Sequence, residues 1–257
     1  MIHCETPQAV YNARNIPFWL LSAFKAGFIN SAGFLLIGEF VSHVTGFGTR
    51  VGIAIGHHGY FMGLELLIIP IAFIGGGIAT SAILDRKKFS EEVPAYYKVQ
   101  GLITLLIAVV IGIGEKGWVS DKIQFGADWS YSLAEFVVLG LLCFICGLKN
   151  GLVAWTTHGK IRVTHLTGLS TDIGLNFIHM FKPRSLSPRF KETAKVNVVR
   201  MLIMLCFSVG AFTSAIIFPQ IGYQGFFIVF FISLIMTIYS IYDSFILRRQ
   251  DRQQTFR

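Results

Sequence analysis

The sequence predicts an all-α polytopic membrane protein with six transmembrane helices and two re-entrant half-helices, arranged as an inverted 3+3 repeat. Three observations predict this fold class. Hydrophobic residues make up 53% of the 257-residue chain and charged residues only 14%, with a mean hydropathy of +0.62. This balance suits a bilayer better than water. The apolar residues gather in long runs, and blocks of the first half of the chain recur in the second half.

A transmembrane helix needs about 20 apolar residues, and six runs in the chain are of this kind. The first run is longer than the core of a signal peptide and has no clear small-residue cleavage site behind it, so a retained helix is expected. A single membrane domain is expected over 1–257, with cytoplasmic tails at 1–15 and 248–257. The six predicted spans cover about 16–38, 60–84, 99–115, 132–155, 196–218 and 223–247.

Two further segments, Val41 to Gly56 and Val163 to Met180, are helix-like but short. Each contains Gly and Thr residues and carries a charge, at Arg50 or at Asp172. Irregular backbone is tolerated at membrane depth only where protein buries it or where it lines a cavity. Re-entrant segments that enter and leave on one face are therefore favoured over full crossings.

The basic residues set the predicted orientation. Of the 22 Lys and Arg residues, 16 lie on one side of a six-span topology and three on the other, while three fall within spans. Cytoplasmic loops of membrane proteins are rich in Lys and Arg, so both termini are placed in the cytoplasm, below an inner membrane. The net charge of +8 is thus attributed to topology and not to nucleic acid. The run from Lys182 to Lys195 is expected to contact anionic lipids.

Three blocks of the first half recur in the same order in the second half. Because each half holds an odd number of predicted spans, the halves must have opposite orientations, with a site near the midplane at their interface. Repeat 1 is expected at about 16–115 and repeat 2 at about 132–247. The blocks are Gly27 to Asn30 with Gly147 to Asn150, His43-Val-Thr45-Gly46 with His165-Leu-Thr167-Gly168, and Gly77 to Ile83 with Gly210 to Ile216, at offsets of 120, 122 and 133.

Small residues are spaced four apart within the third block, as Gly77 with Ser81 and Gly210 with Ser214. Residues at this spacing lie on one face of a helix. Small residues on one face let the backbones of neighbouring helices approach closely in lipid. A packing role is therefore expected for both pairs.

The second block predicts a binding site. In each re-entrant segment a Thr-Gly step lies where a short helix begins, at Thr45-Gly46 and at Thr167-Gly168. A helix N-terminus presents unpaired N–H groups and partial positive charge. Two such ends that meet near the midplane would suit a small anion or a dipolar solute. The alternative is that both threonines only cap their helices, or that hydroxyls bond back to the preceding turn.

These residues together resemble the YoaK family of bacterial membrane proteins, a family of unknown function. The likeness covers nearly the whole chain and rests on the two His-x-Thr-Gly elements and the Gly-x-x-Asn elements before them. It implies an inner-membrane protein with six spans and supplies no substrate. The chain departs from the family pattern at Asn30, where Asp is usual, at Phe47, where Asn is usual, and at Lys149, where Gln is usual.

Several polar residues fall within or close to the apolar depth, where each should pair or face a wet cavity. Lys149 is the sharpest case, because a buried Lys can act as the counter-charge of an anion or change its protonation in a transport cycle. The alternative is a structural pair with Glu65 or Glu135. Arg50 and Asp172 occupy equivalent repeat positions and are candidates for a second pair. The polar residues at this depth are Lys25, Asn30, Glu65, Glu135, Lys149, Asn150 and Asp172.

Other potentially reactive residues have simpler interpretations. His43 and His165 have no Cys or carboxylate partners at ligand spacing, so each is expected to be hydrogen-bonded just before its half-helix. Cys143 and Cys146 lie one turn apart inside a span and are expected to be small packing residues. No metal or cofactor is therefore expected.

Two functions remain open from the sequence. The first is a small secondary transporter or facilitator of a small polar or anionic solute, and the second is a non-transporting scaffold or sensor whose polar centre is structural. An enzyme is not expected, because no nucleophile and base stand at a recognisable spacing. A homo-oligomer also remains open. The candidate substrate-binding residues are Asn30, Thr45, Gly46, Lys149, Asn150, Thr167, Gly168 and Asp172.

Overall fold

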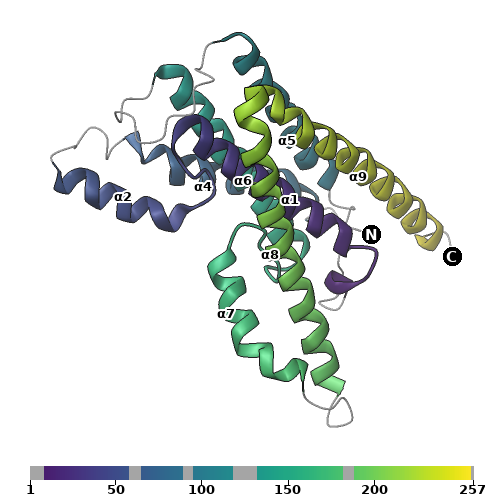
Figure 1. Cartoon of the computed structure of the whole chain (residues 1–257). Helices are drawn as coiled ribbons and strands as arrows, with labels where there is room; N and C mark the ends of the chain where they lie inside the picture. Colours follow the sequence, from purple (N-terminus) through teal and green to yellow (C-terminus); the bar gives the residue numbers. More distant parts are fainter. Residues whose placement is uncertain (1–8, 58–64, 89–94, 118–131, 182–187, 256–257) are drawn as a thin grey trace.

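The computed structural model describes residues 9–57, 65–88, 95–117, 132–181 and 188–255 (Figure 1). Within these ranges the chain forms helices, turns and loops and no strand, so the predicted all-α class is confirmed. The helices are η1 (Ala9–Tyr11), α1 (Ile16–Ile37), α2 (Val44–Gly56), α4 (Ile68–Lys88), α5 (Tyr96–Glu115), α6 (Leu133–Thr156), α7 (Leu166–Phe177), η2 (Ile178–Met180), α8 (Pro188–Ile221), η3 (Gly222–Gly225) and α9 (Phe226–Thr255).

Five helical stretches are long and apolar enough to cross a membrane. Four of them are α1, most of α4, α5 and α6. The fifth stretch, 192–246, runs through α8, η3 and α9 and so covers both the fifth and the sixth predicted spans. These lengths and compositions identify an integral multi-pass membrane protein.

Local signals in the sequence set the ends of the long helices. Pro17 lies in the first turn of α1, where its fixed φ suits a helix and its missing N–H costs nothing. The same helix ends at Gly38, whose φ of 81° is left-handed and therefore favours glycine. A capping box opens α6: the Ser132 hydroxyl accepts the Glu135 N–H, and the Glu135 carboxylate accepts the Ser132 N–H. Glu135 is therefore engaged at the start of α6.

The close contact between α1 and α8 depends on two glycines. A β-carbon at Gly27 would lie 1.9 Å from the Phe207 carbonyl oxygen, and one at Gly210 would lie 2.0 Å from the Phe24 carbonyl oxygen. Real β-carbons do not approach backbone atoms this closely, so only glycine permits these helices to pack at this distance.

The contact between α4 and α6 repeats this arrangement. A β-carbon at Gly147 would lie 2.0 Å from the Phe73 carbonyl oxygen, and one at Gly76 would lie 2.3 Å from the Phe144 carbonyl oxygen. The residues of the two contacts correspond along the sequence. The glycine and phenylalanine of α1 lie 120 residues before those of α6, and the glycine and phenylalanine of α4 lie 134 residues before those of α8. The two central helix pairs are therefore built by the same contacts.

The contacts correct the predicted packing face of α4. Gly77 has no atom within 4 Å of its β-carbon position, and Ser81 is exposed, so the packing role expected for this pair is wrong. Gly76 and Thr80, one position earlier, form the packing face instead. The Thr80 hydroxyl lies 3.0 Å from the Leu148 carbonyl oxygen on α6. The adjacent glycines at 76 and 77 made the sequence register ambiguous by one residue.

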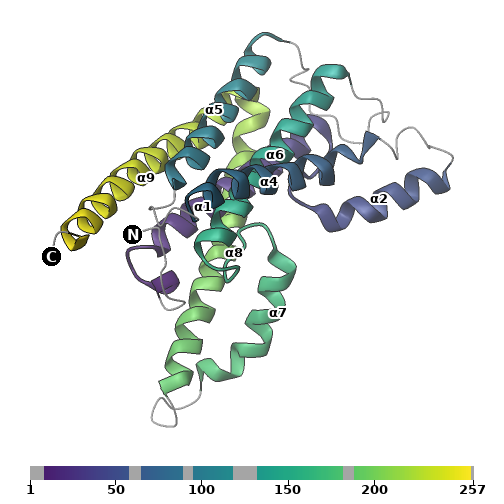
Figure 2. The same ribbon diagram turned by 180° about the vertical axis from the view of Figure 1, so that it is seen from behind.

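The remaining long helices flank the two central pairs. α5 packs against both α9 and α6, and α9 also contacts α1. Figure 1 and Figure 2 show α5 and α9 side by side along one edge of the bundle.

The two predicted half-helices are short helices that project from the bundle (Figures 1 and 2). α7 has 12 residues and packs along α8, whereas α2 has 13 residues and touches the rest of the chain mainly at α4. Their short length agrees with the prediction, while their re-entrant placement in a bilayer stays a prediction.

Replacing Gly76 with Ala is expected to destabilise the protein, because the new methyl group would force α4 and α6 apart. Overpacking of this kind costs about 1–3 kcal/mol, which for a chain of this size lowers the unfolding midpoint by roughly 3–10 °C. Gly77→Ala is the matched control, since its methyl group meets open space. Thermal unfolding in detergent should separate the two variants, and equal midpoints would contradict the described packing.

Candidate functional site

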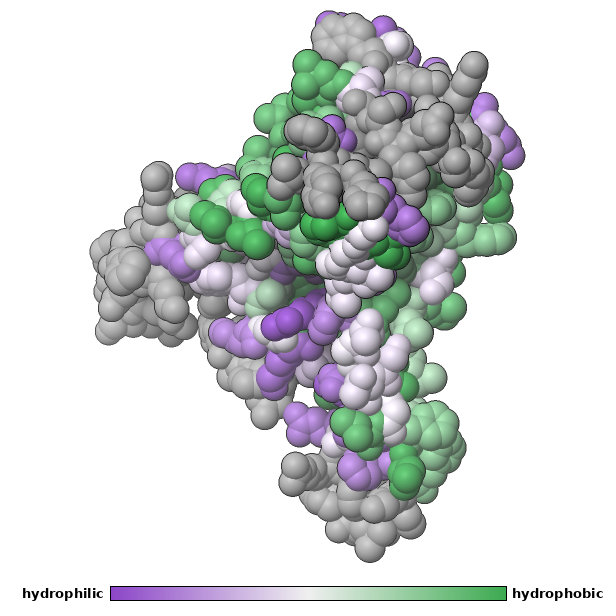
Figure 3. Space-filling view, turned by 90° about the vertical axis from the view of Figure 1, so that its left-hand side faces the viewer, coloured by the Kyte–Doolittle hydropathy of each residue, from purple (hydrophilic) through white to green (hydrophobic). Residues whose placement is uncertain are grey.

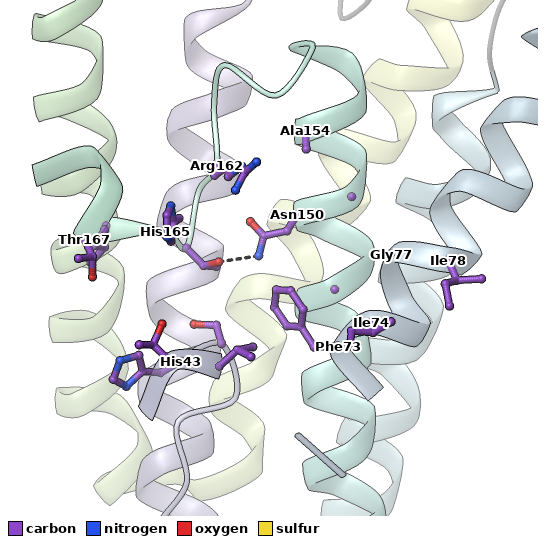
Figure 4. A pocket seen from close by; sticks show the side chains of 17 residues that line it. His43, Phe73, Ile74, Gly77, Ile78, Asn150, Ala154, Arg162, His165 and Thr167 are labelled. Carbon is purple, nitrogen blue, oxygen red and sulfur yellow. Dashed lines mark hydrogen bonds between the residues drawn. The ribbon is translucent and has the colours of Figure 1, made fainter. Parts of the chain in front are cut away.

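A cavity of about 500 Å³ lies where the N-termini of α2 and α7 meet α4 and α6 (Figure 4). Its polar wall comes from two equivalent segments, 42–45 and 164–167, together with Asn150 on α6 and Arg162 in the loop before α7. Its apolar wall includes Phe73 and Ile74 of α4. The cavity therefore lies between the two predicted half-helices. We call it the central pocket.

The surface of the described residues is not uniformly apolar. On the face shown in Figure 3, hydrophilic residues gather near the middle, next to areas that are hydrophobic. An apolar exterior is expected for a membrane protein, so polar surface between apolar areas points to a functional site.

The structure brings some of the predicted site residues together and separates others. Thr45, Asn150 and Thr167 all line the central pocket, as expected for a site between the N-termini of the two short helices. The other predicted site residues do not belong to its lining; they are Asn30, Gly46, Lys149, Gly168 and Asp172.

Asn30 acts outside the pocket by holding the loop that leads into α2. Its side-chain oxygen accepts the Ser42 N–H at 3.0 Å and the Ser42 hydroxyl at 2.8 Å. Both bonds use the oxygen, which an aspartate also has. An aspartate at this position could therefore accept the same two bonds.

Asn150 contacts the loop before α7 in a similar way, but as a hydrogen-bond donor. Its side-chain nitrogen lies 2.6 Å from the Thr164 hydroxyl oxygen, in the loop that leads into α7. Its side-chain oxygen is buried and has no hydrogen-bond partner in the part of the chain that the structure describes. Each Gly-x-x-Asn element thus has two roles. Its glycine lets a long helix, α1 or α6, pack closely against its neighbour, and its asparagine holds the loop that leads into a short helix.

The two glycines of the Thr-Gly steps have a steric role. A β-carbon at Gly46 would lie 2.7 Å from the His43 ring, and one at Gly168 would lie 2.6 Å from the His165 ring. Each imidazole therefore lies over the first turn of its helix. The residue three positions after the histidine, Gly46 or Gly168, is small enough to leave room for the ring. This steric demand accounts for the glycine of the His-x-Thr-Gly pattern.

The threonines of these elements do not cap their helices. The N-cap residues are His43 and His165, and neither makes a side-chain capping bond. Thr45 and Thr167 are exposed and line the central pocket. One back-bond of the expected kind occurs further along α7, where the Thr171 hydroxyl donates to the carbonyl oxygen four residues earlier.

The predicted ion pair between Arg50 and Asp172 is wrong. Arg50 pairs with Glu39 and also donates to the Gly38 carbonyl oxygen at 3.2 Å. Asp172 pairs with Arg200 of α8 at 2.8 Å. The physical reason is that α2 and α7 diverge from the pocket, so charges beyond their first turns are carried apart (Figure 1).

A second cavity of about 350 Å³ lies near the Asp172 pair. Arg200 lines it together with Tyr11, Lys160 and Glu192. Burial raises the pKa of the Tyr11 hydroxyl, so this group stays neutral at physiological pH. The lining carries charges of both signs, in contrast to that of the central pocket.

Neither predicted carboxylate partner reaches Lys149. The lysine is 1% exposed, and its Nζ has no hydrogen-bond partner among the described residues. Glu65 is exposed, and Glu135 is occupied in the capping box of α6. The pairing alternative is therefore wrong for both. The sequence could not reveal this, because a residue number on a helix does not fix which long side chains meet.

Arg162 is the site residue that the sequence analysis placed elsewhere. It was counted among the basic residues of a cytoplasmic loop, whereas the structure places it in the lining of the central pocket (Figure 4). Its position two residues before Thr164, within the segment that carries the family likeness, was the available signal.

The central pocket is electropositive. Arg162 and the imidazoles of His43 and His165 contribute to its lining, and among the described residues no Asp or Glu does. The N-terminal ends of α2 and α7 add partial positive charge. Such a lining favours an anionic group over a cationic one.

These features define the class of the protein as an integral, all-helical, multi-pass membrane protein with a polar pocket among its helices. The chain belongs to the family described as "Protein of unknown function (DUF1275)", which matches residues 18–239. This is the YoaK family that the sequence resembles, so the resemblance is confirmed. No curated protein and no solved structure matches the chain.

The acceptor role of Asn30 can be tested with two substitutions. Asn30→Asp keeps an oxygen for both donors of Ser42, so its unfolding midpoint should stay close to that of the natural chain. Asn30→Leu leaves those donors unpaired, which costs about 1–3 kcal/mol. Thermal unfolding of both variants checks the assignment. Equal destabilisation by Asp and Leu would show that the described bonds to Ser42 do not hold α2.

Proposed function

We propose that this protein is a small secondary transporter or facilitator that binds a small anionic solute in the central pocket. The observation that carries the proposal is the pocket lining, in which Arg162, two imidazoles and two helix N-termini meet without a carboxylate. In a membrane protein, polar groups of this kind are costly unless they serve a passage or a site.

The size and polarity of the pocket suggest the class of solute. A volume of about 500 Å³ falls in the range of small-molecule sites. Arg162 suits a carboxylate, sulfate or phosphate group, because its guanidinium donates two parallel hydrogen bonds. The unpartnered side-chain oxygen of Asn150 suits a hydroxyl or amino donor on the same solute.

The proposal includes an inverted 3+3 repeat with α2 and α7 as re-entrant half-helices. The proposal is supported by contacts in the structure that recur in the two halves of the chain, in addition to the recurring sequence blocks. The glycine contacts of α1 with α8 recur in α6 with α4, and the Asn30 contact recurs at Asn150. Sites between inverted repeats, at the N-termini of broken helices, are typical of secondary transporters.

The membrane placement is also proposed. We infer an inner membrane with both termini in the cytoplasm, because, with Arg162 assigned to the pocket, 15 Lys and Arg residues lie on that side and three on the other. Lipids would surround the bundle, and no catalytic role is proposed. The alternative function is a scaffold or sensor in which the pocket binds no solute.

The proposed function predicts that small anions stabilise the purified protein through Arg162. Acetate, sulfate and glycerol 3-phosphate would be compared with choline by thermal shift, since a ligand that binds only the native state must stabilise it. Arg162→Gln should weaken anion binding about 10- to 100-fold, because it removes a charge-assisted hydrogen bond.

Lys160→Gln is the matched control for this experiment. It removes the same charge two residues away, from a side chain that does not line the central pocket. Anion binding should therefore be almost unchanged. Uptake of the stabilising anion into proteoliposomes would then separate transport from binding. Absence of stabilisation by every anion, or equal loss in both variants, would favour the scaffold alternative.

A further inference from the structure

Two lysines lie fully buried inside the helix bundle. Lys25 on α1 is 0% exposed and Lys149 on α6 is 1% exposed. The helices that carry them, α1 and α6, contact each other. Neither lysine forms a salt bridge with a described residue. Buried ammonium groups without carboxylates are rare in proteins, so this pair calls for a physical explanation.

Lys25 belongs to a polar cluster between α1, α5 and α9. Its Nζ donates to the Ser233 hydroxyl at 3.0 Å, and Gln100 Nε2 donates to the same oxygen at 2.9 Å. A hydroxyl oxygen has two lone pairs, and a third donor, the Thr104 hydroxyl, also lies 2.9 Å from this oxygen. Lys25 thus has one acceptor for the three N–H groups of an ammonium.

Lys149 has fewer partners still. Its Nζ finds no acceptor among the described residues. Cys146 lies one turn before it on the same helix. The carboxylates on the elements packed against α6 have other surroundings: Asp85 of α4 accepts the Trp155 indole N–H, the buried Glu39 after α1 pairs with Arg50, and Glu115 of α5 is exposed.

Among the described residues, the two amines of the pair therefore have one hydrogen-bond acceptor between them, the Ser233 hydroxyl oxygen. Two adjacent positive charges would repel each other and would leave most of their N–H groups unsatisfied in a low-dielectric interior. One charge shared between two amines avoids both costs. Asn150, the next residue along α6, lines the central pocket, so a charge on Lys149 arises one residue along the helix from the site.

We propose that Lys25 and Lys149 together hold a single exchangeable proton, and that an anion in the central pocket and this proton bind cooperatively. The inference rests on the proposed function and adds proton coupling to it. On anion binding, a neutral amine of the pair takes a proton from water and becomes an ammonium. On anion release the proton returns to water. Because coupling between two ligands is reciprocal, a lower pH must tighten anion binding.

The imidazoles of His43 and His165 are further basic side chains in the lining of the pocket. They must be removed before the lysines are tested. His43→Gln/His165→Gln is therefore the background for the experiment. Sulfate is the probe, because its charge is constant between about pH 6 and pH 9.

Sulfate affinity would be measured by thermal shift at about pH 6, 7, 8 and 9 in the full-length protein. In the background variant it should fall about tenfold across this range, within the span typical of coupled sites. Adding Lys149→Met should make the affinity low and independent of pH. Adding Lys149→Arg, which keeps a permanent charge, should make it high and independent of pH.

The outcomes separate the two proposals. Sulfate binding that depends on Arg162 but shows the same pH dependence with Lys149→Met overturns the proton coupling and leaves the proposed function intact. Sulfate binding that is independent of pH in the background variant also overturns the coupling. A chain that binds neither sulfate nor the other anions at any pH overturns both.

Discussion

The structure depends on the close approach of backbones at four glycines. Gly27 and Gly210 join α1 to α8, and Gly147 and Gly76 join α6 to α4, each against a phenylalanine carbonyl oxygen. In lipid, where apolar surface gains little from burial against protein, contacts of this kind are a main source of helix association. Three residues beyond Gly27 and Gly147 stand the asparagines that hold the loops before α2 and α7. Helix packing therefore determines where the two short helices begin, and so where the pocket lies.

Electrostatics then gives the pocket its chemical character. The helix ends, Arg162 and the two imidazoles supply positive potential, and two carboxylates near the short helices pair with other residues: Glu39 with Arg50, and Asp172 with Arg200. Behind the pocket, the buried lysine pair adds a charge whose amount can change. An anion would offset both sources of positive potential, which links the proposed site to the proposed proton.

The all-helical, multi-pass class could be predicted from the sequence, because long apolar runs report a bilayer constraint. The pocket was also partly predictable, since Thr45, Thr167 and Asn150 line it. What failed depends on side-chain direction and partner choice. Adjacent glycines hid a one-residue shift in α4, and equivalent repeat positions did not make Arg50 and Asp172 neighbours. The remaining positions fix packing: Asn30 holds a loop, and Gly46 and Gly168 admit the histidine rings.

The most direct measurement is a cross-link between the starts of the two short helices. Cysteines would replace Thr45 and Thr167 in a chain whose native cysteines are changed to alanine, and a bismaleimide with a span of about 10 Å would be added to membranes. Both positions line one pocket of about 500 Å³, so the account predicts an intramolecular cross-link that excess anion slows. If each cysteine reacts alone but the two are never joined, the helix ends do not share a pocket and the account is contradicted.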